Sequence, residues 1–115
     1  MATMSHSQPN ATPTTIVELC DYSLNNPNKL IVIDFNAPWC GPCKAIKPFV
    51  DYLKENYPNV DFHEISIEDE EREAMISAFD IQKVPTFLYY KKGEVCGKLI
   101  GTNKSQIEEL INDNL

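Results

Sequence analysis

The sequence lacks a long apolar run, and none of its segments approaches the roughly 20 apolar residues of a membrane-spanning helix. It is also poor in basic residues, with 10 Lys plus Arg against 17 Asp plus Glu and a net charge of −7. This charge repels phosphate backbones and anionic membrane surfaces. Neither nucleic acid nor a membrane is therefore expected as a partner.

The N-terminal residues show no targeting pattern. Met1 to Asn10 lack the basic start and apolar stretch of a secretory signal, and they lack the arginine of a mitochondrial presequence. The expected location is cytoplasmic, where isolated thiols stay reduced. The chain's 115 residues suffice for one domain and not for two. We expect residues 1–12 to form a flexible extension or a weak edge strand, and residues 13–115 to form the domain.

Hydrophobic periodicity predicts alternating strands and helices. The predicted strands are 30–35, 60–67, 86–90 and 94–100, with a weak edge strand near Thr12. The predicted helices run from Thr12-Pro13 to Asn25 and over 40–57, 68–79 and 105–115. The apolar run 30–35 suits a central strand, the long helix makes the next strand parallel to it, and the last two strands form a hairpin. The prediction is an α/β fold in which a central mixed sheet of about five strands lies between four helices.

The cysteines are few, and two of them form a close pair. Cys40 and Cys43 make a Cys-x-x-Cys motif, which in a cytosolic protein of this size is typical of redox or metal chemistry. The second half of a zinc site is missing, because the other two cysteines stand alone and His6 and His63 do not form a ligand pair. Metal binding is therefore the lesser alternative.

The paired cysteines stand where a buried strand gives way to a helix. The first turn of a helix has unpaired N–H groups and a partial positive charge, and both stabilise a thiolate. A cysteine so placed can have its pKa lowered from about 8.5 to roughly 3.5–7.5, and only the thiolate attacks disulfides. Cys40 is the predicted nucleophile, and Cys43, one turn deeper and predicted to be less exposed, is the resolving thiol. Gly41 and Pro42 suit the tight turn between them.

The motif Trp39-Cys40-Gly41-Pro42-Cys43-Lys44 resembles the active-site motif of the thioredoxin family. The resemblance covers about Thr14 to Leu115 and includes further matches in the same order: Asp34, Pro48, Val84-Pro85-Thr86, Lys92-Gly93 and Gly101. It implies the thioredoxin fold, with a central sheet flanked by four helices. It also implies reducing activity on protein disulfides and regeneration by a flavoprotein, thioredoxin reductase, which draws electrons from NADPH.

The resemblance implies roles for individual residues. Asp34 is the carboxylate below the cysteines, and its place in an apolar strand should raise its pKa and suit it to proton transfer with Cys43. A hydrogen-bonded structural aspartate is the alternative. Pro85 is implied to be a cis-proline facing the disulfide, against an ordinary trans proline that opens a strand. The implied apolar rim that docks substrates comprises Trp39, Pro42, Val84, Ile100 and Gly101.

Four residues depart from the family's pattern or add to it. Asn36 replaces the aromatic or small residue often found after the buried strand. Glu64 falls about where bacterial members often carry a lysine, and if it lies near Asp34 it should raise the pKa of that carboxyl further. Cys20 and Cys96 fall outside the motif, and packing is favoured over regulation for both, although Cys96 near the hairpin could be partly exposed.

The predicted function is protein-disulfide reduction by dithiol–disulfide exchange, as an electron donor in cell redox homeostasis. The implied partners of this monomer are thioredoxin reductase and disulfide-containing proteins of the peroxiredoxin or ribonucleotide reductase class, with no bound cofactor or metal. An oxidant or isomerase is disfavoured, because such members usually carry His where Pro42 stands. The alternative from another class is a redox-independent binding or scaffold module that uses the same rim. Such a module would keep its cellular function when both motif cysteines are replaced by serine.

Overall fold

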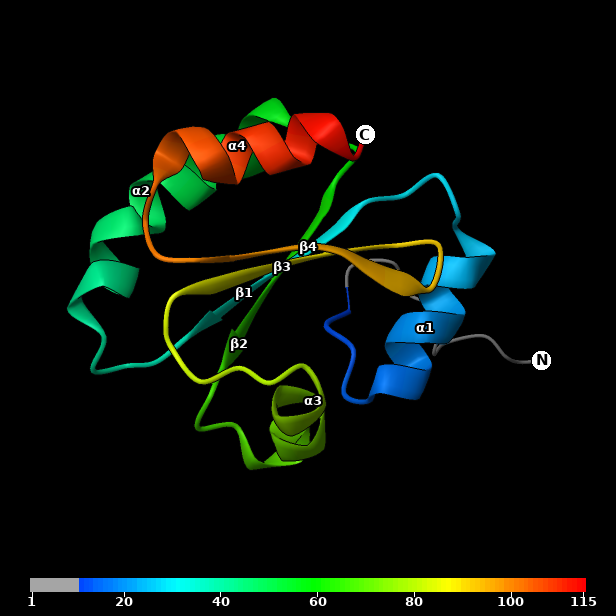
Figure 1. Ribbon diagram of the computed structural model, residues 1–115, viewed down its shortest axis with the longest axis horizontal. Helices are drawn as coiled ribbons and strands as arrows, with labels where there is room; N and C mark the ends of the chain where they lie inside the picture. Colours follow the sequence, from blue (N-terminus) through cyan, green and yellow to red (C-terminus); the bar gives the residue numbers. More distant parts are fainter. Residues whose placement is uncertain (1–10) are drawn as a thin grey trace.

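The computed structural model describes residues 11–115 as a four-stranded mixed sheet between two layers of helices (Figure 1). The strand order is β2-β1-β3-β4. The strands are β1 (Ile31–Asn36), β2 (Asp61–Ser66), β3 (Thr86–Lys91) and β4 (Glu94–Ile100). β1 pairs parallel with β2 and antiparallel with β3, which forms the predicted hairpin with β4.

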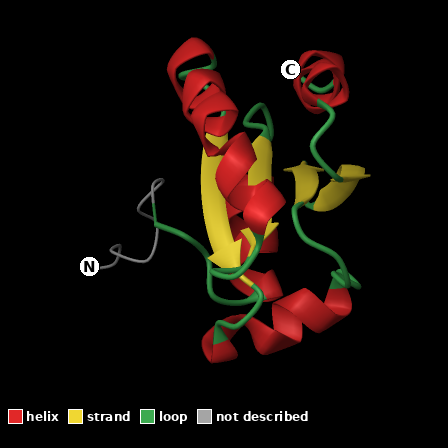
Figure 2. Cartoon of the chain, turned by 90° about the vertical axis from the view of Figure 1, so that its left-hand side faces the viewer, coloured by secondary structure: helices red, strands yellow, loops and turns green. Residues whose placement is uncertain are grey.

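Helices cover both faces of the sheet, as the two orthogonal views show (Figures 1 and 2). One face carries α2 (Gly41–Asn56) and α4 (Lys104–Asp113), and the other carries α1 (Ile16–Asn25) and α3 (Glu73–Ala78). Strand β1 supplies both cores, because Val32 packs in the α2 and α4 layer whereas Ile31 and Ile33 pack in the α1 and α3 layer. This two-sided burial confirms the central position predicted from the apolar run.

The sheet has four strands within residues 11–115, not about five. The predicted edge strand near Thr12 does not form, because residues 11–15 have no strand structure, and Met1–Asn10 lie outside the described residues. The hydroxyl of Thr12 is instead 3.1 Å from His63 Nδ1 on β2. Within residues 11–115, no helix combines the length and the apolar character that crossing a membrane requires.

The first helix begins at Ile16, three residues after the predicted start at Pro13. The reason is a reciprocal cap in which Thr15 Oγ1 accepts the N–H of Glu18 at 3.1 Å, and Glu18 Oε1 accepts the N–H of Thr15 at 3.0 Å. The two bonds satisfy two N–H groups that a helix start otherwise leaves unpaired. The hydroxyl of Thr12 lies against His63 instead.

The predicted helix 68–79 is divided into two shorter pieces. A 3-10 turn, η2, covers Glu70–Arg72 and precedes α3. Asp69 caps this turn by accepting the N–H of Glu71 at 3.1 Å, and it also binds Arg72 at 2.6 Å. Arg72 has φ −109° and ψ 14°, outside the helical region, so the regular α-helix starts only at Glu73.

Thr15→Ala is expected to lower the free energy of unfolding by about 1 kcal/mol, because it removes the side-chain acceptor of the α1 cap. Urea unfolding followed by circular dichroism measures the change. Thr14→Ala is the matched control, since the Thr14 hydroxyl makes no hydrogen bond within residues 11–115. Equal losses in the two variants would contradict the cap assignment.

Candidate active site

Cys40 and Cys43 form a disulfide at the N-terminal end of α2, with their Cα atoms 5.3 Å apart. Cys40 is the N-cap residue, and its extended backbone is held by an N–H bond to Ala37 O at 3.1 Å. The N–H of Cys43 donates to Cys40 Sγ at 3.1 Å. A first-turn N–H is therefore aimed at the predicted nucleophile, and after reduction the same contact favours its thiolate form.

The exposure of the two cysteines is the reverse of the prediction. Cys40 is only 4% exposed, whereas Cys43 is half-buried. The cause is the cap geometry, since Cys40 Sγ turns inward to accept the N–H of Cys43 and to bond with its sulfur. Gly41, between the two cysteines, faces open space, because a Cβ added there would meet no other atom within 4 Å.

Asp34 is a buried carboxyl on β1, and its Oδ1 atom has no hydrogen-bond partner within residues 11–115. Burial, and after it the negative charge of Glu64, raise the pKa of Asp34 to about 7. The ammonium groups of Lys47 and Lys54 act in the opposite direction. Asp34 is thus a group that can take up or release a proton close to neutral pH, as predicted.

Glu64 is the β2 neighbour of Asp34 in the parallel register. Its Oε2 accepts from Lys47 Nζ at 2.9 Å and from Lys54 Nζ at 2.8 Å. Burial alone would raise the pKa of Glu64, but the two lysines lower it on balance and hold the group ionised. The like charge predicted beside Asp34 is therefore present, and two cations partly offset it.

An open groove joins the buried carboxyl to the disulfide. Its lining includes Asp34 from β1, Cys43 and Lys47 from α2, and Glu64 and Ser66 from β2. Water beside the polar side chains of this groove can bridge two groups that do not touch. Cys43 and Asp34 therefore face the same groove.

Two of the predicted rim residues are exposed apolar side chains. Trp39 is 65% exposed and Ile100 is 56% exposed, although both are large apolar residues. The Val84–Pro85 peptide bond is cis, as the resemblance implied. Gly101 has φ 111°, a conformation that favours glycine, and its N–H donates to Pro85 O at 3.0 Å. This bond ties the end of β4 to the start of β3 beside the site.

Sequence reasoning missed three side chains that contact site residues, namely Glu68, Lys47 and Lys54. Trp39 Nε1 donates to Glu68 Oε2 at 2.8 Å, which fixes the indole across the loop after β2. Lys47 and Lys54 were missed as partners of Glu64. A signal for the lysines was present, because the spacing of Cys43, Lys47 and Lys54 places all three on one face of α2.

The other two cysteines lie away from this site. Cys20 on α1 is half-buried, with its Sγ 3.9 Å from Gly93 O, which fits the predicted packing role. Cys96 on β4 is exposed, so packing does not account for it. No group of three or more potential metal ligands comes together within the described part of the chain.

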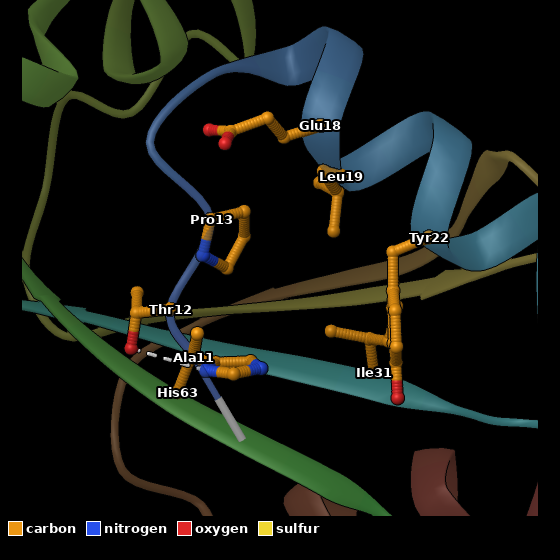
Figure 3. A pocket seen from close by; sticks show the side chains of 8 residues that line it. All are labelled: Ala11, Thr12, Pro13, Glu18, Leu19, Tyr22, Ile31 and His63. Carbon is orange, nitrogen blue, oxygen red and sulfur yellow. Dashed lines mark hydrogen bonds between the residues drawn. The ribbon is translucent and has the colours of Figure 1, made fainter. Parts of the chain in front are cut away.

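A second hollow lies at the start of α1, on the face of the sheet opposite α2 (Figure 3). Figure 3 shows Thr12 beside the ring of His63, with Tyr22 and Leu19 approaching from the helix. None of the predicted site residues lines this hollow. It is therefore separate from the disulfide.

Comparisons with known proteins agree with this geometry. A family model described as Thioredoxin matches residues 14–113. The chain is 45% identical over 86 residues to thioredoxin of Homo sapiens, a match that covers 75% of this chain and 80% of that protein. The crystal structure of Fasciola hepatica thioredoxin superposes with a TM-score of 0.78 at 30% identity, over 89% of this chain and 96% of that chain.

A further solved structure concerns the thiol-resolving mechanism of a yeast mitochondrial 1-Cys peroxiredoxin via glutathione and thioredoxin systems. It superposes with a TM-score of 0.76 at 33% identity, over 88% of this chain and 92% of that chain. This chain thus has the thioredoxin fold.

Asp34→Asn is expected to stabilise the protein at pH 8 and to change little near pH 4. Burial raises the pKa of Asp34 from 3.8 to about 7, so between these values the folded protein binds the proton more tightly than the unfolded chain. Wild-type stability contributed by this proton is full below that window and is lost as the pH rises through it. The variant does not titrate, so its advantage should grow across the window to a few kcal/mol, at about 1.4 kcal/mol per pKa unit.

Urea unfolding of the oxidised protein at several pH values measures this difference. Asp113→Asn, which removes an exposed carboxylate at the end of α4, is the control and should show no such growth. An Asp34→Asn difference that stays constant between pH 4 and pH 8 would contradict the buried-carboxyl assignment.

Proposed function

Because this chain belongs to the thioredoxin family and carries Cys40–Cys43 as the active-site pair of a dithiol–disulfide oxidoreductase, we propose that it works mainly as a reductant of protein disulfides. The observation that supports this direction is the first-turn N–H of Cys43 aimed at Cys40 Sγ. That contact stabilises the thiolate of the reduced protein, which is the form that attacks a substrate.

In the proposed reaction Cys40 is the nucleophile and Cys43 the resolving thiol. The Cys40 thiolate attacks one sulfur of a substrate disulfide, that S–S bond breaks, and a mixed disulfide forms while the other substrate sulfur leaves as a thiolate. Cys43 then loses its proton and attacks Cys40 Sγ, which releases the second substrate sulfur. Two electrons have passed to the substrate, and the enzyme is left with the Cys40–Cys43 disulfide seen in the structure.

Asp34 is proposed to accept the Cys43 proton through water in the groove that both residues line. A base with its pKa near the working pH is suited to this transfer, and burial raises the pKa of Asp34 to about 7. The carboxylate form takes the proton during the second attack, and the proton later leaves to solvent or to a product thiolate. Asp34 therefore assists the step that releases substrate rather than the first attack.

The exposed rim is proposed to dock the substrate around its disulfide. Apolar or open surface is offered by Trp39, Pro42, Ile100 and Gly101. Val84 precedes β3, so its backbone lies outside the hydrogen-bonded strand pairs. An extended substrate segment can bond to such a backbone as an added strand does. Gly41 and Pro42 form the first turn of α2 between the two cysteines.

The proposed electron source is NADPH, delivered by a thioredoxin reductase, with no cofactor held by this chain. Peroxiredoxins and ribonucleotide reductases are the proposed substrate classes. The first is supported by the similarity to the solved yeast structure that concerns thiol resolution in a peroxiredoxin via glutathione and thioredoxin systems. A cytoplasmic monomer is proposed, with residues 13–115 as the domain. An exposed free thiol, Cys96, fits a reducing compartment of this kind.

Cys40→Ser is expected to abolish insulin reduction, because the attacking thiolate is gone. Turbidity of insulin driven by dithiothreitol measures the activity, and the rate should fall to that of dithiothreitol alone. Cys96→Ser removes an exposed thiol outside the motif and should keep the wild-type rate. Substantial turnover by Cys40→Ser would refute the assigned nucleophile, and a wild type without activity would refute general disulfide reduction.

Cys43→Ser is expected to stop the reaction after the first attack, because no thiol remains to release the substrate. Intact-mass analysis after mixing the variant with oxidised insulin should show a mixed disulfide that dithiothreitol removes. The Cys40→Ser, Cys43→Ser double variant is the control and should form none. Failure to detect the adduct with Cys43→Ser would argue against the resolving role.

A further inference from the structure

Lys54 lies near the C-terminal end of α2, far along the helix from the cysteines at its start. It does not line the groove that contains Asp34 and Cys43. Its ammonium group nevertheless lies 2.8 Å from Glu64 Oε2. The bonded contact of Lys54 is therefore with Glu64, the register neighbour of Asp34 on β2, and its charge acts on the buried carboxyl from beyond that residue.

Both lysines of this cluster bind the same oxygen of Glu64 but they are not equivalent. Lys47 divides its contacts between Glu64 at 2.9 Å and Asp51 at 3.1 Å. Lys54 has Glu64 as its only ion-pair partner within residues 11–115. The charge of Lys47 is thus shared between Asp51 and Glu64, whereas Lys54 directs its charge to Glu64 alone.

We propose that Lys54 is a positioning residue for disulfide reduction: by binding Glu64 Oε2 it offsets the negative charge beside Asp34 and keeps the Asp34 carboxylate available as a base at neutral pH. This inference rests on the proposed role of Asp34 in proton transfer. Without Lys54, Glu64 would present more of its charge to Asp34, and like charges at short range disfavour ionisation. Asp34 would then stay protonated to higher pH.

The other groups around Asp34 leave this role open to Lys54. From β3 the register neighbour is Phe87, which carries no charge. From α2 the groove is faced by Cys43, Lys44 and Lys47, and from β2 by Glu64 and the uncharged Ser66. Among these groups Glu64 raises the pKa of Asp34, whereas Lys47 and Lys54 lower it. Asp34 therefore responds to the balance between one carboxylate and two lysines.

The test follows the titration of Asp34 in the oxidised protein by carboxyl carbon NMR, which needs no substrate. Lys54→Gln should move the midpoint upward by roughly half a pH unit, less than the one to three units typical of a charge in direct contact. Lys54→Arg keeps the charge and should restore the wild-type midpoint. Lys92→Gln, at the exposed hairpin turn, makes the same change in net charge and should leave the midpoint unshifted.

A double variant tests whether Lys54 acts through Glu64. Glu64→Gln alone should lower the midpoint, and adding Lys54→Gln to it should cause a smaller further change than Lys54→Gln causes in the wild type, because the ion pair that holds Lys54 beside Glu64 is already absent. An unshifted midpoint in Lys54→Gln would overturn the proposal. A shift of equal size with and without Glu64 would overturn it as well.

The pH dependence of insulin reduction separates this inference from the proposed function. If Asp34 is the base, the rising limb of rate against pH should move upward in Lys54→Gln by the same amount as the NMR midpoint. A moved midpoint with an unmoved rate profile would uphold the control of Asp34 by Lys54 and refute the role of Asp34 in catalysis.

Discussion

The N-terminal end of α2 is the point on which the architecture of the site depends. A helix start requires partners for its unpaired N–H groups, and here one of them is satisfied by the sulfur of Cys40. The helix begins there because β1, which is buried on both faces, fixes the position and direction of the chain at the C-terminal end of this strand. The two-layer packing of the whole domain therefore aims one backbone dipole at one sulfur atom.

The same strand that anchors the helix also carries a group that weakens the fold. Asp34 occupies an interior position of β1, between Ile33 and Phe35, which are fully buried. A carboxyl at such a position has no partner on one oxygen and is costly to ionise. Stability is thus given up at the place of the proposed proton transfer, at a pH set first by burial and then by Glu64 and its two lysines.

The sequence predicted most of this arrangement, and its errors have local physical causes. The long helix, the hairpin and the central strand were predictable because periodicity and motif agreed at each of them. The start of α1 was misplaced because a Thr-Pro pair resembles a helix start, whereas the reciprocal bonds of Thr15 and Glu18 are decided by geometry. The division of the third helix depended on the side chains of Asp69 and Arg72, which a run of acidic residues conceals.

The site could be predicted as a set of residues but not as a network. The cysteines, Asp34 and the cis Pro85 follow from the motif, while the contacts of Glu64 join positions 10 and 17 residues apart and require the strand register.

The position of Trp39 has a practical consequence. It is the only tryptophan of the chain and directly precedes Cys40, with its indole held by Glu68 at the rim. All indole fluorescence of the protein thus originates beside its disulfide. Its intensity and wavelength therefore report on the redox state and the occupancy of the site without an added label.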